Sequence, residues 1–285
     1  MQLRRLLVAH KWFVVSLLLL GVFAIFTFIF STGILLYPTL YVERWLLHRP
    51  LTGIDCVFGE WKQLGAVGFS LFFTLVLGVV CLVLGYRRRI LPLLFCLLLL
   101  GVGAEYVGKQ IFPQIIPINT QFGTPSLACP QLRRETRSER LMVAMGMWWK
   151  ALPAHPDRIQ AEQYSANAPF VFDENAVVVY GYPSGHAIRW IFLGIIACWL
   201  VWRHLQKRVL RVLLMALALA IAFGGGFLQF YIGVHLTTDL MGGYLLGGSL
   251  ACCAIGLLLL NKPKRRQQIS PVPSSQGEQA SIKGV

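Results

Sequence analysis

Residues 12–34, WFVVSLLLLGVFAIFTFIFSTGI, decide the class of fold, because they form a long apolar run without a charged side chain. A helix needs about 20 such residues to cross a bilayer core of about 30 Å. Five further apolar runs follow, at 64–85, 89–108, 187–203, 209–233 and 240–261. The chain has 285 residues, of which 56% are hydrophobic, and a mean hydropathy of +0.63. We therefore expect an all-α polytopic membrane protein, built as a bundle of six transmembrane helices.

Basic residues gather beside alternate ends of these runs, and the net charge is +14. They are Arg4, Arg5 and Lys11; Arg87, Arg88 and Arg89; Arg203, Lys207, Arg208 and Arg211; and Lys262, Lys264, Arg265 and Arg266. The positive-inside rule predicts that these clusters and both termini are cytoplasmic, and that the loops 35–63, 109–186 and 234–239 face outward. Nucleic-acid binding is disfavoured, because the clusters are short, flank the spans and contain no interleaved aromatic residues.

The chain reads as one membrane domain, 1–262, followed by a tail, 263–285. The tail is rich in proline, serine and glutamine and is predicted to be disordered. Residues 113–182 form a long outward-facing insertion between the third and fourth spans. Within it, 132–152 suits an amphipathic helix, which lies either at the membrane interface or over the bundle. The β-branched runs in 168–183 predict either a small hairpin or an extended segment.

Two of the seven cysteines, Cys56 and Cys129, lie outside the predicted spans, and both fall in outward-facing loops. An oxidising compartment would allow these two thiols to form a disulfide. The alternative is a pair of free thiols. We expect the disulfide.

Three polar clusters lie at the predicted outer ends of spans. The first contains Glu105 and Lys109, the second is GYPSGHAIRW at 181–190, and the third contains His235 and Asp239. Ionisable groups at the depth of a membrane are costly, so a functional role is the first interpretation. Three clusters on the same side predict one shared site.

His235 and Asp239 are four residues apart, so one helical turn brings the imidazole and the carboxylate together. A carboxylate on one ring nitrogen fixes the tautomer and makes the other nitrogen a better base or nucleophile. The alternative is a capping role for Asp239 at a helix start, with Thr237 or Thr238 as the N-cap. Capping alone does not account for the histidine.

The stretch Pro183-Ser184-Gly185-His186 predicts a helix that begins at or just after Ser184. Unpaired backbone N–H groups at a helix start bind anions, and the serine hydroxyl adds a donor. His186 lies in the first turn, where a protonated imidazole can act as a general acid for a leaving alkoxide. The alternative is an ordinary helix start with a chance histidine.

These residues resemble the type 2 phosphatidic acid phosphatase (PAP2) superfamily of membrane lipid phosphatases, whose pattern is Lys-x6-Arg-Pro, then Pro-Ser-Gly-His, then Ser-Arg-x5-His-x3-Asp. The chain has Lys109 and Pro117 of the first part, all of the second, and His235 and Asp239 of the third, with Gly233 in its usual place. The resemblance implies a six-helix fold, catalysis by His235, Asp239 and His186, and phosphate binding by Lys109, Ser184 and Gly185. It also implies that the protein works with no metal and no cofactor.

Two phosphate-gripping arginines of the pattern are missing, since Ile116 stands before Pro117 and Leu228–Gln229 replaces Ser-Arg. Arginine is favoured at such positions because its fork binds two oxygens at once. Arg189 lies one turn after His186 and is expected to compensate; the alternative is that it extends to the lipid headgroups.

Four further arginines of the insertion, Arg133, Arg134, Arg137 and Arg140, are expected on its solvated or lipid-facing surface. Glu105 either holds Lys109 in place or only neutralises it.

The sequence therefore predicts a lipid phosphatase of the inner membrane that hydrolyses a phosphomonoester or pyrophosphate of an amphiphilic substrate on the periplasmic or exterior face. The resemblance implies a phosphohistidine intermediate. A lipid phosphotransferase that uses the same intermediate is one alternative, and a non-catalytic phospholipid-binding protein is another. The expected partners are the lipid phosphate and the bilayer, with no nucleic acid and no predicted oligomeric state.

Overall fold

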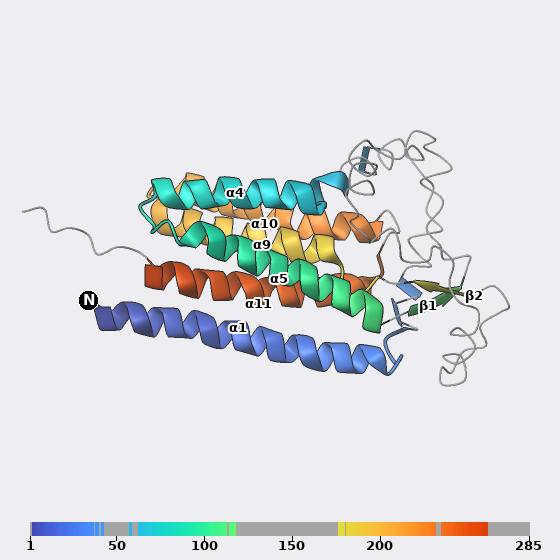
Figure 1. The fold of residues 1–285 in the computed structure, drawn as a ribbon. Helices are drawn as coiled ribbons and strands as arrows, with labels where there is room; N and C mark the ends of the chain where they lie inside the picture. The colour runs from blue at the N-terminus through green and yellow to red at the C-terminus, as the bar shows by residue number, and fades with distance from the viewer. Residues whose placement is uncertain are drawn as a thin grey trace, which may run out of the picture.

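The structure is a computed structural model that describes residues 2–36, 38–39, 41–42, 57–58, 62–112, 114–117, 176–179, 181–231 and 235–261. Its elements, in chain order, are α1 (Gln2–Ser31), η1 (Lys62–Gly65), α4 (Val67–Val83), α5 (Ile90–Ile111), β1 (Gln114–Pro117), β2 (Ala176–Val179), α9 (Gly185–His204), α10 (Arg208–Tyr231) and α11 (Thr237–Asn261). The long helices run side by side along one common direction (Figure 1). The predicted all-α six-helix bundle is confirmed.

The helix within the second predicted span, 64–85, is shorter than expected. Five of the described helices are long and apolar enough to cross a membrane, whereas α4 has 17 residues. Its rise is about 26 Å, slightly less than the bilayer core. The helix begins at Val67 because the residues before it form the 3-10 turn η1, which ends at Gly65.

The helices α9 and α11 form the centre of the bundle, and glycines let their backbones approach closely. A Cβ added to Gly243 would lie 2.6 Å from the carbonyl oxygen of Ser184, and one on Gly247 would overlap the backbone of Ile188. Small residues four apart are a common device for close helix packing in membranes. This packing fixes the start of α9 against the start of α11.

The first helix, α1, packs along α11 on one side of the bundle (Figure 1). The Ser249 hydroxyl donates to the carbonyl of Ser16 at 2.9 Å, and the Ser16 hydroxyl donates to the carbonyl of Ser249 at 2.8 Å. Near the other end of α1, the hydroxyls of Thr27 and Tyr182 are 2.6 Å apart, and the ring of Phe30 stacks on that of Tyr182. Since the hydrocarbon core offers no water, such polar contacts stabilise helix association.

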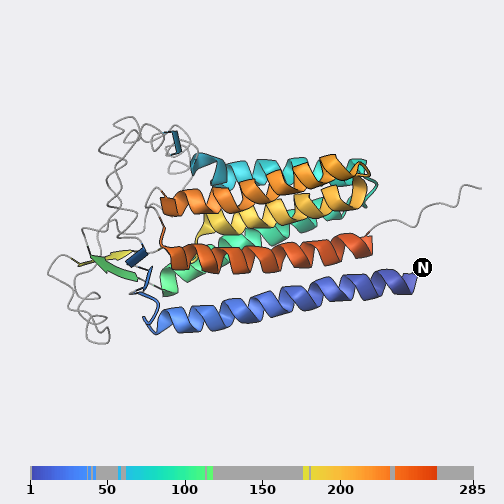
Figure 2. The same ribbon diagram turned by 180° about the vertical axis from the view of Figure 1, so that it is seen from behind.

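The two ends of the bundle differ in character. One end of the bundle holds the start of α1, the end of α11, and the connections from α4 to α5 and from α9 to α10 (Figures 1 and 2). The two short strands lie at the other end. The basic residues Arg87, Arg88, Arg89 and Lys207 belong to these two connections. Alternate basic connections therefore share one end, as the charge pattern predicts.

The strands pair antiparallel, with Gln114 opposite Val179 and Pro117 opposite Ala176. The described part of the β-branched run before α9, residues 176–179, therefore pairs with residues at the far end of the insertion. Residues 168–175 lie outside the described residues, so the predicted local hairpin stays a prediction. The pairing joins the two ends of the predicted insertion. The predicted amphipathic helix, the four insertion arginines, both loop cysteines, Gly233 and the tail lie outside the described residues.

Candidate active site

His235 and Asp239 meet at the start of α11, as their spacing predicts. His235 Nδ1 lies 3.2 Å from Asp239 Oδ2, and both residues are buried. In the tautomer that carries its proton on Nδ1, this carboxylate accepts that N–H, and the lone pair of Nε2 is available. The backbone N–H of His235 donates to the carbonyl of Gln229 at the end of α10, so the histidine is fixed from both sides.

Asp239 also stabilises the start of α11, although the threonines do not cap it. The same Oδ2 atom accepts the backbone N–H of Leu236 at 3.0 Å. The hydroxyls of Thr237 and Thr238 have no hydrogen-bond partner among the described residues, so the alternative that assigns either of them as the N-cap is wrong. One carboxylate therefore binds both the imidazole and the helix start.

The Pro-Ser-Gly-His stretch forms the start of α9, as expected. Ser184 is the N-cap, and its hydroxyl oxygen accepts the N–H of Ala187 at 3.5 Å. The backbone N–H of Ser184 donates to the carbonyl of Asp239 at 2.9 Å. This backbone bond joins the second sequence cluster directly to the third.

His186 lies in the first turn of α9, and its ring faces the site of the other histidine. The ring centroids of His186 and His235 are 6.4 Å apart. Reacting atoms in a productive complex are about 3–3.5 Å apart, so a phosphoryl group fits between a nucleophile and an acid at this separation. The two imidazoles therefore lie close enough for one small anion to contact both.

The Glu105 carboxylate, in the C-terminal part of α5, binds two cations. Its Oε1 atom accepts from Lys109 Nζ at 2.7 Å, and its Oε2 atom accepts from an Arg189 guanidinium nitrogen at 2.5 Å. The Arg189 Nε–H also donates to the carbonyl of Gly65 at 2.9 Å. The Arg189 side chain is 3% exposed, so it points into the bundle and does not extend to the headgroups.

Gln229, which replaces an arginine of the PAP2 pattern, is buried at the end of α10. Its side chain is 1% exposed, and neither its amide nitrogen nor its amide oxygen has a hydrogen-bond partner among the described residues. A buried amide without a partner is costly, so such a group usually marks a place where a ligand binds or water enters.

Gly65 contacts the site, although no motif in the sequence indicates it. Its carbonyl binds Arg189, and a Cβ at this position would overlap the ring of His186 and lie 2.7 Å from Trp190 Nε1. A single glycine before an apolar run has no local pattern that predicts such a contact. Its role depends on the packing of η1 against α9.

No three His, Cys, Asp or Glu side chains gather as metal ligands would within the part of the chain that the structure describes. The expectation of a site that works without metal stays a prediction.

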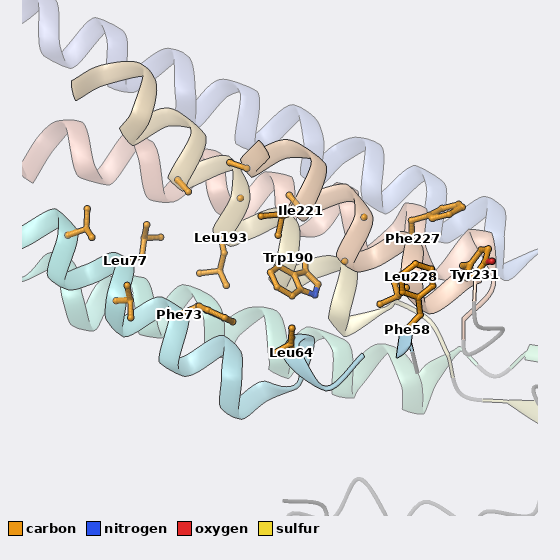
Figure 3. A pocket seen from close by; sticks show the side chains of 18 residues that line it. Phe58, Leu64, Phe73, Leu77, Trp190, Leu193, Ile221, Phe227, Leu228 and Tyr231 are labelled. Atoms are coloured by element: carbon orange, nitrogen blue, oxygen red, sulfur yellow. The ribbon is translucent and has the colours of Figure 1, made fainter. Parts of the chain in front are cut away.

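An apolar cavity of about 1030 Å³ lies between α4, α9 and α10 (Figure 3). Trp190 and Leu193 of α9 line it opposite Phe73 and Leu77 of α4, and Tyr231 of α10 is near one end. Trp190 follows His186 by one helical turn, so the two side chains lie on the same face of α9. The cavity offers an apolar surface of the kind that a hydrocarbon chain contacts.

Comparison with known proteins shows what part of the chain is similar to a known family. The sequence model of the PAP2 superfamily matches residues 141–263, which contain α9, α10 and α11, and this confirms the predicted resemblance. The first cluster, with Glu105 and Lys109, lies outside the matched residues, and the fold alone brings it to the site. No curated protein sequence matches the chain.

A solved structure has a similar fold. It is the crystal structure of a transmembrane PAP2-type phosphatidylglycerolphosphate phosphatase from Bacillus subtilis, with a TM-score of 0.51 and 19% sequence identity. The similarity covers 88% of this chain and 98% of the other. At this level of identity the match shows a shared fold.

Proposed function

We propose that this protein is a membrane lipid phosphatase that hydrolyses a phosphomonoester or pyrophosphate of an amphiphilic substrate. The observation that carries the proposal is the His235–Asp239 pair, placed opposite His186 at the start of a helix that can receive an anion. The match to the PAP2 superfamily supports the same chemistry.

In the proposed first step, His235 Nε2 attacks phosphorus while Asp239 holds the proton on Nδ1. The N–P bond forms as the bond from phosphorus to the leaving oxygen breaks, and His186 gives its proton to that oxygen. In the second step, a water molecule attacks the phosphohistidine, His186 takes a proton from the water, and the N–P bond breaks. The two histidines therefore end in their starting protonation states.

Charge stabilisation in the proposed reaction comes from Lys109, Arg189, Ser184 and the amide of Gly185. Positive groups and N–H donors that are fixed in advance stabilise the charge on the phosphoryl oxygens in a site shielded from water. Because Arg189 is fixed by Gly65 and Glu105, it supplies a cation where the usual arginines are absent.

The apolar cavity beside Trp190 supports an amphiphilic substrate, whose hydrocarbon chain would lie there while its phosphate reaches the histidines. The basic connections at the opposite end of the bundle support a cytoplasmic position for that end. The proposed site then faces the periplasm or the exterior of an inner membrane.

The test is phosphate release by purified protein in detergent with EDTA present. The substrates are phosphatidic acid, phosphatidylglycerol phosphate, an isoprenyl pyrophosphate and lipid A, and the wild type is compared with His235→Ala. Release by the wild type and none by the variant is expected on at least one lipid. Release that needs added metal, or that persists in the variant, contradicts the mechanism.

Phosphate transfer to a lipid acceptor without release would identify a phosphotransferase. Absence of both reactions, with lipid binding retained, would identify a binding protein.

A further inference from the structure

The Glu105 carboxylate lies in the position where the site should bind phosphate. It contacts Lys109 and Arg189, the two cations of the described residues at this end that would bind substrate oxygens. Its two oxygens are divided between them, as two oxygens of a bound phosphate would be. A carboxylate and a phosphate share the fork-like arrangement of oxygens that such cations recognise.

The same carboxylate lies against the first residue of α9. A Cβ added to Gly185 would overlap the carboxyl carbon and both oxygens of Glu105. The first N–H groups of a helix have no partner within the helix and attract anions. Glu105 therefore pairs with two cations beside a helix start, with its carboxylate on the side of Gly185 where a Cβ would stand.

The Glu105 carboxylate also explains how the charge of the buried Arg189 side chain is stabilised. A guanidinium that is 3% exposed needs a partner, because an uncompensated buried charge is strongly destabilising. A substrate can serve as that partner only while it is bound. Glu105 serves as the partner in the substrate-free protein.

We propose that Glu105 occupies the phosphate position in the substrate-free protein, and that the incoming phosphate displaces its carboxylate from Gly185 and takes over Lys109 and Arg189. This proposal rests on the proposed function, because it takes these cations as the phosphate-binding groups. Substrate binding is then an exchange of one anion for another. A phosphate must then bind Lys109 and Arg189 more strongly than the Glu105 carboxylate does in order to displace it.

The proposed exchange predicts whether a simple substitution strengthens or weakens the binding of phosphate. Glu105→Gln keeps the size of the side chain and removes the competing charge, so inorganic phosphate should bind at least about tenfold more tightly. If Glu105 only positions Lys109 and Arg189, the same substitution loosens both cations and phosphate binds more weakly. The two interpretations therefore give opposite results.

The measurement uses the full-length protein in detergent, with inorganic phosphate as the probe and the rise in melting temperature as the readout. Gln110→Glu serves as a matched control, because it changes the charge by one unit at an exposed position of the same helix. Its phosphate affinity should differ from the wild type by less than about twofold, because the charge of an exposed side chain is screened by solvent and salt.

A second variant keeps the test decisive if Glu105→Gln does not fold. Glu105→Asp keeps the charge but withdraws the carboxylate from Gly185 by one methylene. It should bind phosphate more tightly than the wild type, by a smaller factor. Equal, weaker or absent binding in the variant that folds would overturn the proposal.

The readout separates this proposal from the proposed function, because binding of phosphate needs no turnover. If phosphate binds more tightly to Glu105→Gln than to the wild type, while the wild type hydrolyses none of the lipids, the proposed function is contradicted and the exchange of anions is supported. If lipids are hydrolysed and Glu105→Gln binds phosphate no more tightly, the exchange alone falls.

Discussion

The candidate site has two sides that are built differently. The histidine side, made of His186, His235 and Asp239, holds every PAP2-pattern residue expected there, and short-range bonds at two helix starts fix it. The ion-pair side, made of Glu105, Lys109 and Arg189, joins α5 to α9, and one of its cations stands outside the pattern. The contrast teaches that the groups proposed for bond making follow the pattern, whereas charge compensation can be rebuilt from neighbouring helices.

The largest expected effect concerns the histidine side. Asp239→Asn should lower kcat by about 10²- to 10⁴-fold, because the amide no longer fixes the tautomer of His235 or stabilises its positive charge. KM should change little, since Asp239 is not proposed to contact the substrate. The amide oxygen of asparagine can still accept the N–H of Leu236, so the fold should persist.

Steady-state kinetics on the lipid that the wild type hydrolyses measures this effect, with the melting temperature as the control for folding. A fall in kcat of less than about fivefold would remove Asp239 from the mechanism.

The next effect tests the ion-pair side through stability. Arg189→Met should lower the free energy of unfolding by about 3 kcal/mol, because it leaves the largely buried Glu105 with Lys109 as its remaining partner. Chemical unfolding in mixed micelles measures the change. The double variant Arg189→Met with Glu105→Gln should recover part of the loss, since no uncompensated carboxylate remains. A double variant less stable than the single one would contradict the pairing.

A smaller effect tests the packing that holds the histidine side in place. Gly247→Ala should lower the free energy of unfolding by about 2 kcal/mol, because the new methyl group would overlap the backbone of Ile188 and separate α11 from α9. Gly248→Ala is the matched control, because its Cβ would meet Leu19 at an ordinary distance of 3.5 Å. The same unfolding experiment compares the two. Equal stability of the two variants would show that this helix contact is not tight.

The smallest effect asks whether Gln229 serves the ligand or the fold. Gln229→Leu should raise the free energy of unfolding by about 1 kcal/mol, because it removes a buried amide that has no partner among the described residues. If the amide serves the ligand, the substitution should also lower kcat/KM about tenfold, because a polar group that binds the substrate is lost. Thermal unfolding and phosphate release measure the two changes. Lower stability with unchanged kinetics would assign the amide to the fold.

Much of the bundle followed from apolar run length. Each of the six predicted spans overlaps one of the described helices. The helix α9 begins at Gly185, directly after the serine that was predicted to cap it. The second span was overestimated, because residues 64–66 are apolar or small but belong to a turn and its connection. Hydropathy reports the preference of a side chain for lipid and does not distinguish a helix from a short turn beside it.

The histidine side could also be predicted, because its contacts are local. His235 and Asp239 are one turn apart, and His186 follows a helix cap, so spacing alone predicts the first contact and the position of the second. The alternative of a capping threonine was wrong, because α11 begins at Thr237 and both threonine hydroxyls lack a partner among the described residues. Which of several neighbouring residues begins a helix cannot be decided from residue type alone.

The sequence by itself determined the helices, the basic end of the bundle and the polar clusters, because these depend on composition and on spacing within one element. Only the tertiary structure decided that Arg189 binds Glu105 and the carbonyl of Gly65, and that the Glu105 carboxylate lies against Gly185. These contacts join residues 80 or more positions apart in the chain. Their physical cause is the packing of α5 and η1 against α9, which no periodicity in the sequence encodes.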